Sequence, residues 1–413
     1  MALEGRRSLF ISYNGMLEPL GQTQVIPYLR ELAKRGVDVT LLSFEKPHAY
    51  SDAGREECRL RQLQLSADGI DWHWLPYHQS PSLPATAYDV FAGRRYAKQL
   101  VEQKKIELVH SRGHIPATIA LPLKKHAPVK TIFDLRGLMA EEYVDAEHWR
   151  KGGLPYRLTK TVERRIFATT DAIVTLTERI WPIISKWEGL RDRSVHHSVI
   201  PCCVDLSTFK FSHEDRKRRR DALGLGDRFT LIYSGSLDGW YLTEKMADFF
   251  ATFVRRHSQG HLLWLTTGSH DRVKSLMSKR NIPESNFSVL AVSAPEVTSY
   301  LSAADSGIAF IKPCISKLAS SPTKNGEYLA CGLPLILNAG IGDSDALVDV
   351  WNAGALVREL DETSYCDALD KIEVLVQDPE TRTRMREVAT RVFDLYSIGA
   401  ERYAALYEKV LTN

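Results

Sequence analysis

The stretch SSPTKNGEYLACG, from Ser320 to Gly332, decides how the second half of this chain folds. It follows a strand-like run, DSGIAFI, at 305–311. Ser321 and Pro322 predict a helix start, because serine caps helices and proline suits the first helical position. The glycine at its end predicts the helix stop. A helix that begins at the carboxyl end of a parallel strand directs free N–H groups toward a ligand, so this stretch predicts a phosphate or pyrophosphate site.

Three polar residues of the same stretch suit such a ligand. Thr323 begins the amide-rich tip, and Lys324 in the first turn supplies positive charge. Glu327 lies three residues further on the same helix face, where a carboxylate can accept hydrogen bonds from a ribose diol. The alternative interpretation is an ordinary capped helix with a Lys–Glu pair on its surface.

Strand-like and helix-like segments alternate on both sides of this stretch. Strands are predicted at 9–13, 37–44, 70–75, 107–111, 130–134, 171–176, 195–200, 229–233, 262–266, 287–290 and 305–311, and the chain ends in helical segments near 360–377, 380–391 and 394–411. Alternation of this kind predicts parallel sheets. A chain of 413 residues is too long for one core, so it predicts two doubly wound α/β domains, with a linker at 201–209.

Composition excludes several classes of protein. Hydrophobic residues make up 44% and charged residues 25%, as in soluble globular proteins, and the net charge of +3 argues against a dedicated nucleic-acid binder. None of the six cysteines forms a C-x-x-C pair, so neither a zinc site nor a disulfide framework is expected. No apolar stretch is long enough for a membrane span or a signal peptide. We therefore expect a cytoplasmic protein, with at most peripheral contact at the inner face of the membrane.

Four segments together resemble the family 4 retaining glycosyltransferases. They are GQTQVIPYLRELAKRGVDVTLL (21–42), IPCCVDLSTF (200–209), YSGSLDGWY (233–241) and SPTKNGEYLACGLPLI (321–336). The resemblance implies the GT-B fold, in which two Rossmann-like doubly wound domains face a central cleft. It implies an acceptor-binding domain at 1–203, a nucleotide-sugar-binding domain at 204–392, and a final helix at 393–413 that crosses back to the first domain.

The resemblance also implies an activity. Such an enzyme moves a sugar, with retention, from a nucleotide-diphosphate donor to a hydroxyl acceptor, which would be a glycan, a polysaccharide precursor, a lipid-linked glycan or a small metabolite. It needs no metal, no other cofactor and no protein nucleophile. A nucleotide-sugar 2-epimerase-like enzyme and a non-catalytic nucleotide-sugar-binding subunit are the alternatives. Two residues depart from the family pattern: Ala319 replaces the first of two paired glutamates, and Ser236 stands near an arginine position.

Candidate site residues follow from the motifs and the resemblance. Those expected to bind the donor are Gly21, Ser236, Ser321, Thr323, Lys324, Glu327 and Gly342. Those expected to act in catalysis are Asp134, Arg136 and Lys324, and those expected to bind the acceptor are Gln22, Arg112 and Glu141. Three plainer interpretations stay open: a strand–helix loop at 15–22, a simple Asp134–Arg136 pair, and an acidic helix start at Glu141.

Two further patterns each allow two interpretations. Asp343, Ser344 and Asp345 form an acidic D-x-D at a helix start, where a helix cap is favoured over a metal site. The basic run RKRRR, Arg216–Arg220, is typical of a solvated helix face. It would otherwise dock on anionic lipid or bind a charged acceptor.

Overall fold

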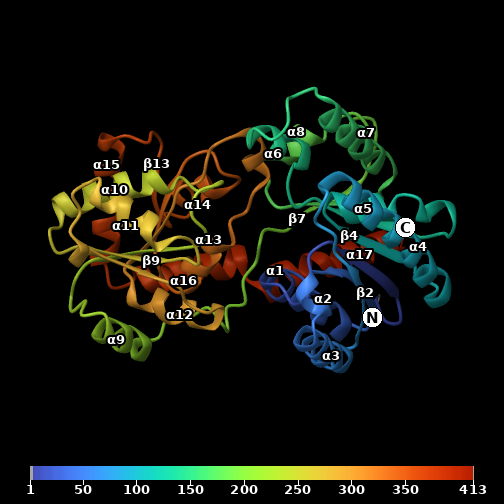
Figure 1. The fold of residues 1–413 in the computed structure, drawn as a ribbon, viewed down its shortest axis with the longest axis horizontal. Helices are drawn as coiled ribbons and strands as arrows, with labels where there is room; N and C mark the ends of the chain where they lie inside the picture. Colours follow the sequence, from blue (N-terminus) through green and yellow to red (C-terminus); the bar gives the residue numbers. More distant parts are fainter. Residues whose placement is uncertain (1–2, 413) are drawn as a thin grey trace. The chain divides into compact units, whose positions relative to one another are not determined.

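The computed structural model describes residues 3–412, and the chain divides into two compact units (Figure 1). Unit 1 combines Met1–Pro201 with Leu395–Asn413, and unit 2 spans Cys202–Asp394. The sequence analysis predicted these domain boundaries after residues 203 and 392. Each unit contains one fully parallel sheet with helices on both faces, and both doubly wound domains of the GT-B prediction are therefore present.

Unit 1 is built on a seven-stranded sheet in the order β3-β2-β1-β4-β5-β6-β7. Its strands are β1 (Arg7–Ser12), β2 (Asp38–Glu45), β3 (Ile70–Pro76), β4 (Leu108–Arg112), β5 (Lys130–Asp134), β6 (Ala172–Thr175) and β7 (His196–Val199). Its α-helices are α1 (Pro19–Gln24), α2 (Ile26–Lys34), α3 (Asp52–Ala67), α4 (Ser82–Lys104), α5 (His114–Ala120), α6 (Met139–Asp145), α7 (Leu154–Thr169), α8 (Trp181–Ile184) and α17 (Glu401–Thr412). The order reverses between β1 and β4, which is where ligands bind in open α/β sheets.

Unit 2 is built on a six-stranded sheet in the order β10-β9-β8-β11-β12-β13. Its strands are β8 (Thr230–Ser234), β9 (His261–Leu265), β10 (Phe287–Leu290), β11 (Ser306–Ala309), β12 (Leu335–Asn338) and β13 (Gly354–Val357). Its α-helices are α9 (His213–Ala222), α10 (Thr243–Arg256), α11 (His270–Ser278), α12 (Ala294–Ala303), α13 (Thr323–Ala330), α14 (Ser344–Asp349), α15 (Glu362–Gln377) and α16 (Thr381–Phe393). Here the reversal lies between β8 and β11, and the residues that follow these two strands carry the donor motifs.

The central strands are buried on both faces, which explains their continuous apolar sequences. In β9, all five residues of HLLWL are buried. Trp264 packs among aromatic side chains of unit 2, including Tyr233 and Phe250. This close packing makes the sheet a rigid platform for the loops at its carboxyl edge.

The chain returns to unit 1 after Asp394 and ends there as α17. The Tyr403 hydroxyl donates a hydrogen bond to Asp134 Oδ2 at 2.8 Å, and the Tyr407 hydroxyl lies 3.0 Å from His110 Nδ1. All four side chains are buried. The last helix therefore supplies part of the polar and apolar interior of unit 1.

Four elements differ from the sequence-based expectations. Helices α7 and α8 and strand β13 were not predicted. Residues 19–24 form helix α1, where a loop was expected, because Pro19 occupies a position near the helix start that needs no backbone donor. Within residues 3–412, no helix combines the length and the apolarity needed to cross a bilayer.

The basic run on α9 is not a solvated face, and that prediction is wrong for three of its five residues. Arg216 Nη1 donates to the carbonyls of Ser302, Ala303 and Ala304, and its Nη2 pairs with Asp305 at 2.6 Å. The buried Arg220 also binds the Ala303 carbonyl, and Arg219 lies over the Tyr300 ring. Arg216 and Arg220 thus satisfy carbonyls at the end of α12 that have no partner within the helix.

Candidate functional site

Helix α13 begins beside the β8–β11 reversal of unit 2. Its first residue is Thr323, and Pro322 occupies the N-cap position without a side-chain capping bond. The prediction that Ser321 caps this helix is wrong, because its Oγ accepts a hydrogen bond from the Cys202 amide at 3.2 Å instead. Ser321 therefore ties the start of α13 to the linker at 201–209, and no side chain in the described part of the chain caps the helix tip.

Lys324 occupies an unusual environment in the first turn of α13. Its side chain is only 7% exposed, and among the described residues Nζ has no hydrogen-bond partner. The ammonium lies 3.7 Å from the centre of the Tyr241 ring and 4.4 Å from that of Tyr233. Burial lowers the pKa of Lys324 to about 7. Aromatic faces compensate a buried cation only in part, so an anionic ligand would complete this environment.

Glu327 lies one turn further along α13, half-buried. Burial raises the pKa of its carboxyl group to about 7, and the nearby Lys324 charge opposes this shift. The structure thus brings together the cation and the carboxylate that the sequence predicted for the diphosphate and the ribose.

A turn after β8 encloses the Lys324 ammonium. The Tyr328 hydroxyl of α13 accepts a hydrogen bond from the Ser234 amide at 2.8 Å, and the Tyr233 hydroxyl donates to the Ser236 carbonyl at 2.6 Å. A Cβ atom at Gly235 would lie 2.7 Å from Lys324 Nζ and 3.1 Å from the Tyr233 hydroxyl oxygen, so a larger residue here would displace the ammonium. The predicted residue Ser236 is therefore close to the start of α13, with its side chain exposed.

A second lysine, Lys317, was missed by sequence reasoning. It is buried, and its Nζ lies 3.8 Å from the centre of the Trp240 ring in the same turn. Its carbonyl accepts a hydrogen bond from the Gly342 amide at 2.9 Å, which places the predicted glycine loop in this neighbourhood. Its position in the loop between β11 and α13, directly before the donor motif, is the sequence feature that could have identified it.

The acidic D-x-D does not cap α14 through its first residue. Asp343 occupies the N-cap position without a side-chain capping bond, and Asp345 Oδ1 accepts a bond from the Gly340 amide at 3.0 Å. Among residues 3–412, no group of three or more His, Cys, Asp or Glu side chains is arranged to hold a metal ion. The D-x-D thus shapes the glycine loop.

In unit 1, the β1–β4 reversal carries Arg112, Gly21 and Gln22. Arg112 Nη1 donates to Asn14 Oδ1 at 3.2 Å, which fixes the arginine beside the loop after β1. A Cβ atom at Gly21 would lie 2.2 Å from the Gly15 carbonyl, so this glycine is already required for packing inside the loop. Gln22 is exposed, and its Nε2 donates to the Leu17 carbonyl at 3.0 Å.

Asp134 ends strand β5 fully buried, which rules out direct contact of its carboxylate with a substrate in this arrangement. Besides Tyr403, its neighbours are His110 Nε2 at 3.7 Å and Arg136 Nη1 at 3.5 Å. Burial alone would raise the pKa of Asp134, but the Arg136 and His110 charges hold it below its usual range. Asp134 is therefore an anion that can orient Arg136 from behind.

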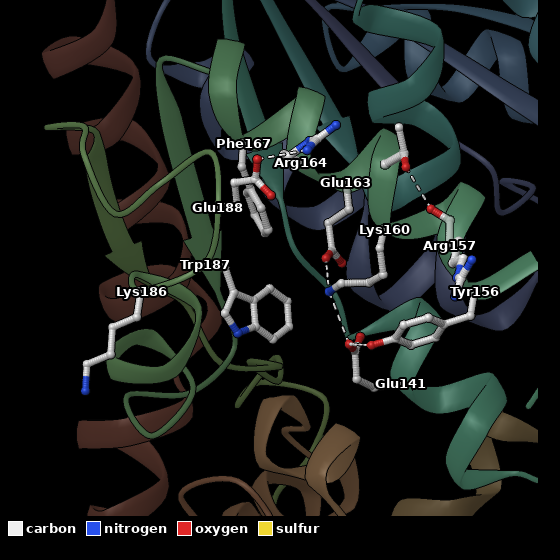
Figure 2. Close-up of a pocket in the computed structure, with 11 residues that line it drawn as sticks. Glu141, Tyr156, Arg157, Lys160, Glu163, Arg164, Phe167, Lys186, Trp187 and Glu188 are labelled. Carbon is white, nitrogen blue, oxygen red and sulfur yellow. Dashed lines mark hydrogen bonds and ion pairs between the residues drawn. The ribbon is translucent and has the colours of Figure 1, made fainter. Parts of the chain in front are cut away.

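Glu141 lines a separate cavity of about 690 Å³ in unit 1, between α6, α7 and the segment that contains Trp187 (Figure 2). The Tyr156 hydroxyl donates to Glu141 Oε1 at 3.3 Å, and Lys160 Nζ lies 3.1 Å from the same oxygen. Lys160 also pairs with Glu163 and lies 3.6 Å from the centre of the Trp187 ring. This cavity combines an aromatic side chain with charged hydrogen-bonding groups. Sequence reasoning had identified only Glu141 among them.

Known proteins resemble the chain in one domain and in fold. Residues 22–202 match the model of the glycosyl transferase 4-like domain. A glycosyltransferase structure from Rickettsia africae aligns with a TM-score of 0.74 at 12% identity, covering 99% of both chains. Sucrose-phosphate synthase from Thermosynechococcus elongatus aligns with a TM-score of 0.71 at 16% identity, covering 98% of this chain and 99% of that one. Anabaena HepE in complex with UDP-glucose aligns with a TM-score of 0.65 at 16% identity, covering 97% and 99%. No curated protein matches the chain in sequence.

These matches confirm the resemblance that the sequence motifs indicated. At 12–16% identity the structural likeness establishes the fold over nearly the whole chain, and the family match covers most of unit 1. Residues 22–202 are therefore similar to a glycosyl transferase 4-like domain, and the chain as a whole has the GT-B fold.

Proposed function

We propose that this protein is a retaining, metal-independent glycosyltransferase that moves a sugar from a nucleotide-diphosphate donor to a hydroxyl acceptor. The acceptor would be a glycan, a lipid-linked glycan or a small metabolite. The observation that carries this proposal is the buried Lys324 ammonium, which has no hydrogen-bond partner among the described residues and lies at the start of α13. A diphosphate at this point would receive charge from Lys324 and hydrogen bonds from the helix tip.

The proposed chemistry depends on the departing diphosphate. As the sugar becomes oxocarbenium-like, negative charge accumulates on the diphosphate, and fixed positive groups lower the barrier most when they are shielded from water. Lys324 is such a group, because it is buried and its ammonium lies beside the Gly235 turn. The acceptor hydroxyl would attack from the face that the diphosphate leaves, and a phosphate oxygen would take its proton. The donor's own oxygen thus serves as the base.

Unit 1 would bind the acceptor. Arg112 ends β4 and Arg136 follows the adjacent strand β5. Asn14 holds Arg112 in place, and Asp134 holds Arg136. Because Asp134 is enclosed, it would act through Arg136 as a positioning residue. Glu141 and its cavity would contribute hydroxyl-binding groups.

Structural neighbours indicate which nucleotide and which sugar to test first as the donor. Solved structures of Anabaena HepE contain UDP, UDP with glucose, and UDP-glucose. We therefore take UDP-glucose as the first donor to test, followed by GDP, ADP, TDP and CDP sugars.

Calorimetry on the Glu327→Ala variant tests the proposal. Loss of a carboxylate that binds two ribose hydroxyls should weaken nucleotide binding by about 100-fold or more, since each bond to a charged group contributes about 1.5–3 kcal/mol. Glu284→Ala, an exposed glutamate elsewhere in unit 2, is the matched control. Wild-type affinity in Glu327→Ala would contradict the donor site.

Turnover assays separate the proposal from its two alternatives. An epimerase-like enzyme would release free sugar and nucleoside diphosphate without any acceptor. A non-catalytic subunit would bind the donor and show no turnover across a panel of acceptors. A glycosyltransferase would release nucleoside diphosphate in step with acceptor glycosylation.

A further inference from the structure

Unit 1 exposes large apolar side chains on two of its helices. Leu83, Tyr88 and Phe91 lie on the N-terminal half of α4, and Leu154 and Leu158 lie on the first turns of α7. Each is 59–71% exposed. Single exposed apolar residues are ordinary, but three large ones within residues 83–91 of one helix and two within residues 154–158 of another indicate a binding partner.

The two helices belong to the same face of the sheet. Helix α5 packs against both α4 and α7, and Figure 1 shows it between them. Both flanking helices begin at the carboxyl edge of the sheet, because α4 follows β3 and α7 runs back toward the start of β6. The exposed side chains therefore lie at the same end of one helical layer, which we call the α4/α7 face.

The charges on this face are mostly positive. Arg95 and Lys98 on α4, and Arg157 and Arg165 on α7, are exposed or half-buried. Of the carboxylates on the two helices, Asp89 is buried against Tyr13 and His78, and Glu163 is buried against His114 and Lys160. Only Glu102, at the far end of α4, is exposed. Lys98 pairs with Glu102 at 3.8 Å, whereas Arg95, Arg157 and Arg165 have no carboxylate partner among the described residues.

We propose that the α4/α7 face docks on the surface of an anionic lipid bilayer. Leucine, tyrosine and phenylalanine side chains would enter the headgroup region, while the arginines and lysines would bind lipid phosphates. This mixture fits a bilayer better than a protein interface, because interface cores are depleted of charge and here cations are interleaved with the apolar residues. The Arg216–Arg220 run offers less of such a surface, because Arg216 and Arg220 bind backbone carbonyls within unit 2.

Vesicle flotation of the full chain tests this proposal. We expect the protein to float with phosphatidylcholine vesicles that contain phosphatidylglycerol, and to float much less with phosphatidylcholine alone or at high salt. The double variants Leu83→Glu with Phe91→Glu, and Leu154→Glu with Leu158→Glu, should each weaken partitioning by about tenfold or more. Because these side chains are exposed, both variants should keep the wild-type melting temperature.

The matched control is Val350→Glu with Val374→Glu in unit 2, where the side chains are 73% and 69% exposed. This control should float like the wild type. Equal flotation of the α4/α7 variants and the control would overturn the proposal. So would a lipid-free dimer that Phe91→Glu dissociates in light scattering, because the face would then bind a second copy. Nucleotide affinity, measured without vesicles, tests the proposed function separately.

Discussion

A positive charge on the buried Lys324 side chain lowers the stability of the fold but would favour binding of an anionic ligand. The lysine pKa is lowered by burial from 10.5 to about 7, so between these values the unfolded chain binds more protons than the folded one. Stability linked to this group therefore rises with pH across that window, and the buried charge is costly at neutral pH and below. A residue retained at such a cost indicates a function that needs its charge.

The first residue-scale prediction concerns Lys324→Met, which keeps the length and removes the charge. It should raise the free energy of unfolding at pH 7 by on the order of 2 kcal/mol, because the desolvated cation is gone. It should also weaken nucleotide-diphosphate binding by about 100-fold, because the anion loses its charge partner. Urea denaturation and calorimetry measure the two effects. A variant that is destabilised and binds normally would show that Lys324 is only a packing residue.

Proton exchange on binding gives a second residue-scale prediction. The bound diphosphate should favour protonated Lys324, and the ribose should favour deprotonated Glu327. Without ligand both groups have pKa values of about 7, so binding must change their protonation. At pH 8 Lys324 is mostly neutral, so binding takes up roughly one proton. At pH 6 Glu327 is mostly protonated, so binding releases roughly one proton.

Calorimetry in buffers of different ionisation enthalpy measures this exchange. Glu327→Gln should keep the uptake at pH 8 and lose the release at pH 6. Lys324→Met should do the reverse. The same sign of exchange at both pH values in the wild type would refute the assigned roles.

At the scale of elements, the donor turn depends on how closely β11 approaches α13. A Cβ atom at Gly307 would lie 2.3 Å from Tyr328 Cδ2, in the ring whose hydroxyl binds the Ser234 amide. Gly307→Ala should therefore push the Tyr328 ring, destabilise unit 2 by about 1–3 kcal/mol and weaken nucleotide binding. Tyr328→Phe is the companion variant, since it removes the hydroxyl and leaves the packing. Wild-type stability and affinity in Gly307→Ala would show that the turn does not depend on this contact.

The elements could be predicted from sequence where local patterns decide them. Strand β5 and strand β10 lie at their predicted residues, 130–134 and 287–290, because short apolar runs bounded by polar residues determine both. Strand β13 was missed, because GALV is too short and too rich in small residues to stand out. Local patterns therefore predicted the alternation of strands and helices, and hence the fold class.

The candidate site could be predicted only in part. The spacing of Lys324 and Glu327 is local, so the α13 motif was visible. The Trp240 ring near Lys317 and the Tyr403 hydroxyl on Asp134 join residues that are far apart in sequence, and no local pattern encodes them. The same reason explains the error at Arg216, whose carbonyl partners lie more than 80 residues away.

At the scale of the whole molecule, the two units should differ in how they respond to a change at the C-terminus. Tyr403→Phe removes the hydroxyl that binds Asp134 and leaves a buried carboxylate with one fewer donor, at a cost of about 1–3 kcal/mol. Because both residues belong to unit 1, its unfolding transition should move to lower temperature while that of unit 2 stays in place. Scanning calorimetry with and without nucleotide assigns the two transitions. Tyr88→Phe, on an exposed tyrosine of unit 1, is the control, and equal shifts in both transitions would contradict the assignment.

The route of the chain through its units has a consequence for biosynthesis. A ribosome makes the first half of the protein first, but His110 and Asp134 stay uncovered until the closing helix leaves the exit tunnel. The middle of the polypeptide, Cys202–Asp394, contains every segment of its own unit and can reach its native state earlier. The part translated first is thus the part completed last, and a nascent chain of this protein spends most of its synthesis with one open sheet face that chaperones can bind.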